Sequence, residues 1–301
     1  MIKYLDGTHE TPDYRQSTHI RLYKNSLFEN YPPHWHFPIE MVMPIENNYT
    51  VIVNNETYVL KPYEILFIAP GVIHSTISPP TGIRFFFQVE ISWLKSITSV
   101  NQILTFMGST SLFNKENSPD IHDSLVLLYE DICSEYLNSE EFSAGTCTEL
   151  NKNLLSEPII YSKFLEMLYL IGSNHINNVS SELGGNTKKN EYLDKIMSVC
   201  NYIDDHFADD ITLDDMAQLA GFSKFHFSRL FKQVTSQTLY RYINQQRISY
   251  AEILLDDPKI PITQIAIQSG FSSSSSFIRM FKLIKNCTPS EFRRLHEQLT
   301  P

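Results

Sequence analysis

An internal duplication near the C-terminus constrains the fold of this 301-residue chain more than any other feature of its sequence. The run AQLAGFS at residues 217–223 aligns with AIQSGFS at residues 266–272, at an offset of 49. RLFK at residues 229–232 aligns with RMFK at an offset of 50, so the second copy contains a one-residue insertion. Each copy predicts a helix, a tight turn and a second helix, because Gly221 and Gly270 stand where a short turn needs a permissive residue.

The second helix of the first copy is expected to turn one face to the core and the other to solvent. Phe227, Leu230 and Phe231 recur at helical spacing and are expected to be buried. The outward face is then expected to carry Lys224, Phe225, Ser228, Arg229 and Lys232. A helix that presents arginine and small polar groups has the size and chemistry that the major groove of DNA accepts.

Capping residues mark the expected helix starts. Thr212 with Asp215 has the spacing of a capping box for the first helix of the first copy. Ser223 and Ser272 are expected to cap the second helix of their copies.

The charge distribution also favours nucleic acid, although the net charge is −10. Residues 1–190 contain 12 Lys and Arg against 21 Asp and Glu, whereas residues 191–301 contain 12 against 13. Residues 216–251 and 258–290 contain no acid and carry five and four cations. A single copy is also consistent with an ordinary helical hairpin, but two copies in acid-free basic windows favour binding to phosphates.

With these motifs identified, residues 192–296 resemble the double helix-turn-helix domain of the AraC/XylS (arabinose-regulator) family of bacterial transcription factors. The matching stretches are ITLDDMAQLAGFS, FSRLFK, YINQQRI, the region around SGFS, and FK followed by TPSEFR. The resemblance implies two recognition helices in successive major grooves of double-stranded promoter DNA. A long helix at about 239–255 would join the two units.

Carried onto this sequence, the resemblance assigns two kinds of DNA contact. The base-facing candidates are Phe225, Ser228, Arg229, Ser274, Ser275 and Arg279. Phosphate contacts are expected from Lys224, Lys232 and Lys282 and from amides at helix starts. The sequence departs from the family where Gln237 and Leu239 replace the usual Gly and Pro. A run of five serines, Ser272–Ser276, opens the second recognition helix, so we expect that unit to add more affinity than specificity.

The N-terminal third has the pattern of antiparallel β-structure, a barrel or a sandwich. Runs rich in β-branched and aromatic residues lie at 39–45, 49–53, 57–60, 65–68 and 83–91. Helical periodicity follows, with helices expected at 121–137 and, opened by Pro158, at 158–172. We expect an effector-binding barrel at 1–92, a helical segment at 93–173, a linker at 174–190 and the all-α double helix-turn-helix domain at 191–301.

A spaced set of polar residues lies within the expected barrel. His34-Trp35-His36 is followed by Glu40, and Pro70-Gly71 precedes His74. Residues two apart on a strand point to the same side, so His34 and His36 can converge with Glu40 and His74. Three imidazoles and a carboxylate suit a transition metal. The pattern resembles the metal motifs of the cupin superfamily, and it is more closely similar to the cupin-like sensor domains of AraC-type regulators.

The sensor resemblance implies that His34, Trp35, His36, Glu40 and His74 bind a small effector, a sugar by family habit, with no cofactor. One alternative is that His34, His36, Glu40 and His74 hold a metal, as in a metal sensor or metalloenzyme fused to a DNA-binding domain. Another is a constitutive DNA-binding protein whose barrel takes no ligand. The sequence shows no Ser/His/Asp or Cys/His constellation, so we expect no enzyme activity.

The resemblance implies an effector-responsive, sequence-specific transcriptional regulator of carbohydrate-metabolism genes. By family analogy it would activate by contacting RNA polymerase, but the sequence itself does not distinguish an activator from a repressor. Leu127, Tyr129, Leu137 and Tyr169 are expected either to form a homodimer interface or to pack against the barrel. Four scattered cysteines, the lack of a leader sequence and the lack of a membrane-length apolar run predict a cytoplasmic protein with no membrane partner.

Overall fold

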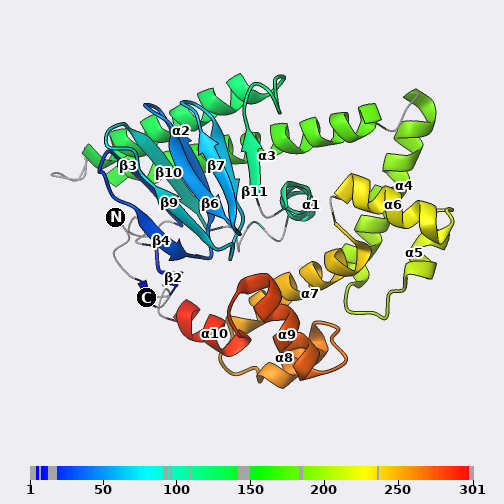
Figure 1. Cartoon of the computed structure of the whole chain (residues 1–301). Helices are drawn as coiled ribbons and strands as arrows, with labels where there is room; N and C mark the ends of the chain where they lie inside the picture. Colours follow the sequence, from blue (N-terminus) through cyan, green and yellow to red (C-terminus); the bar gives the residue numbers. More distant parts are fainter. Residues whose placement is uncertain are drawn as a thin grey trace. The chain divides into compact units, whose positions relative to one another are not determined.

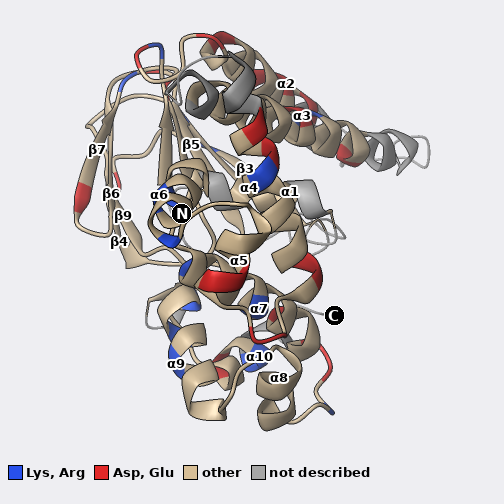
Figure 2. Cartoon of the chain, turned by 90° about the vertical axis from the view of Figure 1, so that its right-hand side faces the viewer, with Lys and Arg blue, Asp and Glu red and all other residues tan. Residues whose placement is uncertain are grey.

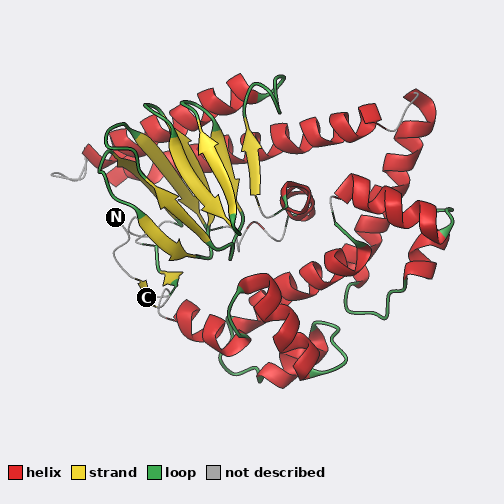
Figure 3. Cartoon of the chain, in the orientation of Figure 1, coloured by secondary structure: helices red, strands yellow, loops and turns green. Residues whose placement is uncertain are grey.

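The computed structural model describes residues 5–6, 8–12, 19–90, 94, 97–108, 110–141, 150–182, 186–235 and 237–297 (Figure 1). The chain divides into two compact units, residues 1–93 with 109–175 and residues 94–108 with 176–301. The first unit contains the β-sheets, and the described part of the second is helical apart from its loops (Figure 3). The expected architecture, an antiparallel β domain with helices and a C-terminal all-α domain, is confirmed.

Two antiparallel sheets form the β domain. The five-stranded sheet has the order β11-β8-β5-β10-β3, and the four-stranded sheet has the order β4-β9-β6-β7. A short ribbon pairs β1 (Leu5–Asp6) with β2 (His9–Glu10). The remaining strands are β3 (Ile20–Asn25), β4 (Tyr31–His34), β5 (Ile39–Pro44), β6 (Tyr49–Val53), β7 (Glu56–Leu60), β8 (Ile65–Ile68), β9 (His74–Ile77), β10 (Arg84–Val89) and β11 (Thr110–Phe113).

All five predicted strands are confirmed, with ends that differ by two residues at most. The prediction missed the shorter or less regular strands. For example, β4 is only four residues long and contains two prolines, and β11 lies inside the segment expected to be helical. β11 pairs with β8 and so extends the five-stranded sheet at its edge.

The strand register gives the five-stranded sheet a polar patch on one face. Glu40 of β5 lies opposite Gln88 of β10, and Gln88 lies opposite Arg21 of β3. Since side chains alternate along a strand, these three groups share one face. All three are buried.

The other face of the same sheet is apolar and packs against two helices, α2 (His122–Glu141) and α3 (Leu150–Glu182) (Figure 1). The Phe87 ring centroid lies 6.3 Å from that of Tyr129 and 5.8 Å from that of Phe164. The Tyr129 hydroxyl donates to the Met41 carbonyl at 2.8 Å. Tyr129 is therefore a packing residue of the β domain, whereas Leu127 and Tyr169 are 64% and 66% exposed and Leu137 is half-buried.

Two details of the helical segment differ from the prediction. Pro158 does not open a helix, because it lies inside α3, which begins eight residues earlier; a proline inside a helix removes one hydrogen bond without having to end it. The segment expected to be a linker is helical on both sides of residues 183–185, since α3 continues to Glu182 and α4 begins at Asn186. The domain boundaries themselves stay a prediction.

The second unit includes α1 (Thr98–Met107), although in sequence α1 lies between β10 and β11. The Gln102 side-chain amide donates to Asn201 at 2.9 Å and to Asp204 at 3.2 Å. Asp204 also accepts from the Tyr242 hydroxyl at 3.1 Å, and burial raises its pKa to about 6. The other helices are α4 (Asn186–His206), α5 (Leu213–Leu219), α6 (Lys224–Thr235), α7 (Leu239–Leu255), α8 (Ile262–Gln268), α9 (Ser274–Lys285) and α10 (Pro289–Glu297).

The duplication is visible in the turns between α5 and α6 and between α8 and α9. Gly221 and Gly270 have φ angles of +70° and +79°, in the left-handed region expected for a tight turn. A Cβ at Gly221 would meet nothing within 4 Å, whereas one at Gly270 would lie 2.6 Å from the Ala208 Cα. The second turn therefore needs glycine for both conformation and space.

No described helix of the chain is long and apolar enough to cross a bilayer. Cys133, Cys200 and Cys287 are buried free thiols, and Cys147 lies outside the described residues.

The two turn glycines give a matched pair of substitutions. Gly221→Ala should lower the free energy of unfolding by about 1–2 kcal/mol, because alanine is strained at positive φ. Gly270→Ala should cost a further ~1–3 kcal/mol, because its methyl group also collides with the Ala208 backbone. Urea unfolding of the two full-length variants measures the difference; equal losses would contradict the described packing at Gly270.

Candidate functional site

The exposed face of α6 carries the side chains predicted to contact DNA. Phe227, Leu230 and Phe231 are buried, as expected. Lys224, Phe225, Ser228, Arg229 and Lys232 are all exposed. Phe225 is 91% exposed, which is unusual for an aromatic side chain and leaves its ring free to contact a partner.

Helix α9 repeats this arrangement with smaller side chains. Ser275, Arg279 and Lys282 are exposed, and Ser274 is half-buried. Neither α6 nor α9 contains an acidic residue, and Figure 2 shows Lys and Arg on both helices. One acid does reach α6, because Asp214 of α5 forms an exposed ion pair with Lys224 at 2.5 Å.

The helix caps agree with the sequence in the first unit and differ by one residue in the second. Thr212 accepts from the Asp215 amide at 3.2 Å, which confirms that cap. The Ser223 hydroxyl accepts from the His226 amide at 3.4 Å. In the second unit the cap of α9 is Ser273, whose hydroxyl accepts from the Ser276 amide, and not Ser272 as expected. The one-residue insertion of the second copy lies before the cap and shifts it by one position.

The same aromatic contacts hold both exposed helices in place. Phe231 meets Tyr242 edge-to-face at 5.6 Å and 84°, and Phe281 meets Phe292 at 5.3 Å and 83°. These pairs are related by the 50-residue offset of the duplication. The structure thus presents two helix-turn-helix units, each with a basic, acid-free second helix on its surface, and this defines a DNA-binding class of fold.

The β domain gathers a second set of predicted residues. His34, His36 and His74 have ring nitrogens that all lie within 4.8 Å of one another. The Glu40 carboxylate lies 3.3 Å from His36 Nε2 and 3.4 Å from His74 Nε2. Every member of this set is buried, and Glu40 is only 2% exposed.

Each of the three histidines has a backbone carbonyl beside its Nδ1 atom. The Nδ1 atoms of His34, His36 and His74 lie 2.9, 3.0 and 2.9 Å from the carbonyls of Pro32, Pro38 and Val72. A carbonyl only accepts, so each Nδ1 donates, and a neutral ring then presents its Nε2 lone pair. Fixing the ring through the second nitrogen in this way is typical of metal-binding histidines.

Three residues that the sequence did not single out complete the cluster. Gln88 donates to Glu40 at 2.7 Å. Arg21 donates to Gln88 at 3.1 Å and to Glu10 at 2.9 Å, and Glu10 lies 3.6 Å from His34 Nε2. The inward position of Gln88 follows from strand alternation and could have been found, whereas the short β2 strand that supplies Glu10 has no periodic signal.

Burial and charge act in opposite directions within this cluster. Burial lowers the pKa of His34 to about 4, with help from His74 and His36. Burial is the largest single effect on His36 and opposes its charged form, but the hydrogen bond to Glu40 and the charges of Glu40 and Glu10 together raise its pKa. Burial raises the pKa of Glu40, but the hydrogen bonds and charges of His36 and His74 together hold this pKa well below its usual range.

The donor set fits a divalent transition metal. An ion about 2 Å from each ligand atom separates two ligand nitrogens by about 3–4 Å, so the observed spacing needs only a small contraction. His34, His36 and His74 would supply three nitrogens and Glu40 an oxygen, a set that zinc, iron, nickel and copper accept. His74 Nε2 makes no hydrogen bond although it is buried and lies 3.4 Å from the Glu40 carboxylate, so an ion between these two groups would bind both.

Trp35, the fifth predicted effector residue, is not part of this cluster. The centroid of its ring lies 4.5 Å from that of His9 and 5.3 Å from that of Phe37. Since it follows His34 and precedes His36 along an extended segment, its side chain takes the opposite side.

Comparison with known proteins agrees with the helical unit. A model of a helix-turn-helix domain family matches residues 216–295. The Transposon Tn10 TetD protein of Escherichia coli is 41% identical over 99 residues, which cover 33% of this chain and 72% of that protein. An uncharacterized HTH-type transcriptional regulator of Staphylococcus aureus (strain COL) is 37% identical over 100 residues, 33% of this chain; the chain spans only 13% of its length.

Among solved structures, ToxT from Vibrio cholerae O395 aligns with 93% of this chain and 98% of its own, with a TM-score of 0.42 and 18% identity. The sequence matches to TetD and to the helix-turn-helix model decide the family. The chain belongs to the AraC/XylS family of DNA-binding transcriptional regulators.

Proposed function

We propose that this protein binds promoter DNA sequence-specifically through α6 and α9 and that a small molecule bound by the β domain changes that binding. The observation that carries the proposal is the repeated pair of basic recognition helices held by equivalent aromatic contacts. Coupling requires an effector that binds the two states of the protein with different affinity.

The two recognition helices would read DNA differently. On α6, Arg229 can bind guanine through two hydrogen bonds, and Phe225 can contact a thymine methyl group, with Ser228 beside them. On α9, Ser274, Ser275 and Arg279 would face the bases. Lys224, Lys232 and Lys282 would bind phosphates.

Other parts of the proposal rest on the family resemblance. These are a homodimer, contact with RNA polymerase, a sugar effector and control of carbohydrate-metabolism genes. The exposed Leu127 and Tyr169 are available for a dimer interface. The buried His34, His36, Glu40 and His74 bond to each other and to the backbone, which supports a small ion at their centre more than a sugar.

Arg229→Ala should weaken binding to an operator selected from a random pool by about 1–3 kcal/mol and change binding to random DNA little, because a base contact is lost. Lys232→Ala should weaken both and reduce the salt dependence by about one counterion, because a phosphate contact is lost. Fluorescence anisotropy at several salt concentrations measures both. Equal losses for Arg229→Ala on both DNAs would contradict its role in base recognition.

The second candidate function is metal sensing by His34, His36, Glu40 and His74, and the three identical Nδ1–carbonyl contacts favour it. After incubation with Zn²⁺, Fe²⁺, Ni²⁺ or Mn²⁺ and dialysis, elemental analysis should find about one ion per chain. His74→Ala should lose the ion, since one ligand is removed. His19→Ala removes an exposed histidine outside the cluster and should keep it; retention by His74→Ala would refute the site.

A further inference from the structure

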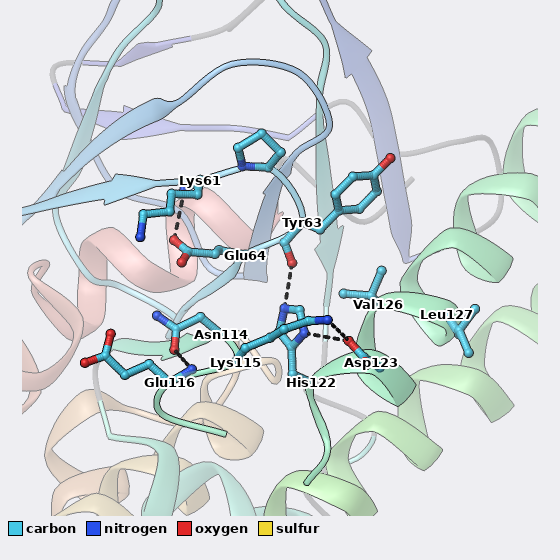
Figure 4. Close-up of a pocket in the computed structure, with 11 residues that line it drawn as sticks. Lys61, Tyr63, Glu64, Asn114, Lys115, Glu116, His122, Asp123, Val126 and Leu127 are labelled. Atoms are coloured by element: carbon cyan, nitrogen blue, oxygen red, sulfur yellow. Dashed lines mark hydrogen bonds and ion pairs between the residues drawn. The ribbon is translucent and has the colours of Figure 1, made fainter. Parts of the chain in front are cut away.

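The β domain carries a cavity of about 630 Å³ that no sequence motif predicts (Figure 4). Three segments line it: the β7–β8 turn at 61–64, the loop after β11 at 114–116, and the first turns of α2. Its volume lies in the range of small-molecule sites. The cavity shares no lining residue with the His34, His36, His74 and Glu40 cluster.

The wall of this cavity is held by an unusual backbone conformation at Tyr63. Its φ is +67°, a value that aromatic residues rarely adopt and that costs free energy. The Tyr63 amide donates to the Pro44 carbonyl at 2.7 Å, and its carbonyl accepts from His122 Nε2 at 3.0 Å. Hydrogen bonds on both sides hold this strained conformation, and Tyr63 is 40% exposed, so the residue is a candidate binding position.

The apolar side chains of the cavity lie at one end, where the lining also includes the Lys115–Asp123 ion pair, and the unpaired charges lie at the other (Figure 4). Lys61, Glu64, Asn114 and Glu116 lie toward one end in Figure 4, and the Tyr63 ring, Val126 and Leu127 lie toward the other. Leu127 is 64% exposed, so its side chain offers apolar surface to a ligand. A ligand that matches both ends needs an apolar part and a compact polar part.

The charged end offers groups of both signs. Lys115 is already paired with Asp123 at 3.2 Å, and Glu64 accepts from the Lys61 amide at 2.9 Å. Among the described residues, the Lys61 ammonium and the Glu116 carboxylate have no partner. Asn114 uses its carbonyl oxygen to hold the Glu116 and Asn117 amides, which leaves its NH2 group free to donate. A free cation and a free anion at one end suit a ligand that carries both charges.

We propose that this cavity binds a zwitterionic α-amino acid with an apolar side chain. Its carboxylate would lie against Lys61 and the Asn114 amide, its ammonium group against Glu116, and its side chain against Tyr63 and Leu127. That such binding alters DNA affinity rests on the proposed function, whereas the binding itself does not.

Calorimetric titration of the full-length protein with L-leucine and L-phenylalanine should show saturable one-site binding. N-acetyl-L-leucine and L-leucinamide each lack one charge and should bind about tenfold more weakly or not at all. Lys61→Gln and Glu116→Gln should each weaken L-leucine binding by about tenfold, whereas Lys24→Gln, an exposed lysine on β3, should change nothing.

Tyr63→Gly removes the ring and relieves the positive-φ strain, so lost binding in this variant reports the missing ring and not an unfolded turn. Absence of binding by either amino acid, or equal binding of the masked derivatives, would overturn the proposal. So would binding of neutral sugars or fatty acids that Tyr63→Gly abolishes. DNA affinity measured with and without L-leucine tests the regulatory role separately: unchanged DNA affinity with intact amino-acid binding leaves the site standing and contradicts the proposed effector response.

Discussion

Two edge-to-face aromatic contacts determine the geometry of the DNA-binding unit. One joins α6 to α7 and the other joins α9 to α10. Phe231 with Tyr242 and Phe281 with Phe292 have nearly the same ring distance and angle. Because these rings fix which face of α6 and α9 is buried, they also fix which face is exposed. The buried aromatic pair of each unit therefore leaves Arg229 on α6 and Arg279 on α9 exposed to solvent.

The β domain depends on a different constraint, a buried carboxylate whose negative charge needs hydrogen-bond donors or cations beside it. Glu40 accepts from Gln88 and lies against His36 and His74, and these contacts keep it charged despite its burial. A divalent cation in this centre would bind the histidine nitrogens and the carboxylate together and so replace their contacts with one another. The cavity beside Tyr63 is, in contrast, partly open and lined by both charged and apolar side chains, so it differs in chemistry from the buried histidine–glutamate cluster.

Most of the exposed surface of α6 and α9 could be predicted from the sequence. The duplication predicts each helix twice, and helix periodicity distinguishes buried from exposed positions. The expected cap of α9, Ser272, is off by one residue: the inserted residue moves the cap to Ser273. In the β domain, alternation and spacing were enough to bring His34, His36, Glu40 and His74 together. Glu10, Arg21 and the cavity at Tyr63 depend on contacts between distant segments, which no local pattern encodes. Pro158 was misleading because tertiary packing tolerates a proline within α3.

We propose that the two exposed helices read DNA together. Dimethyl sulfate and hydroxyl-radical footprinting of the full-length protein on an operator selected from a random pool tests it most directly. If both helices bind, the footprint contains two patches of protected major-groove bases about 10 base pairs apart on one face of the duplex, with the weaker base protection under α9. A single protected patch, or protection of phosphates without protection of bases, would contradict it.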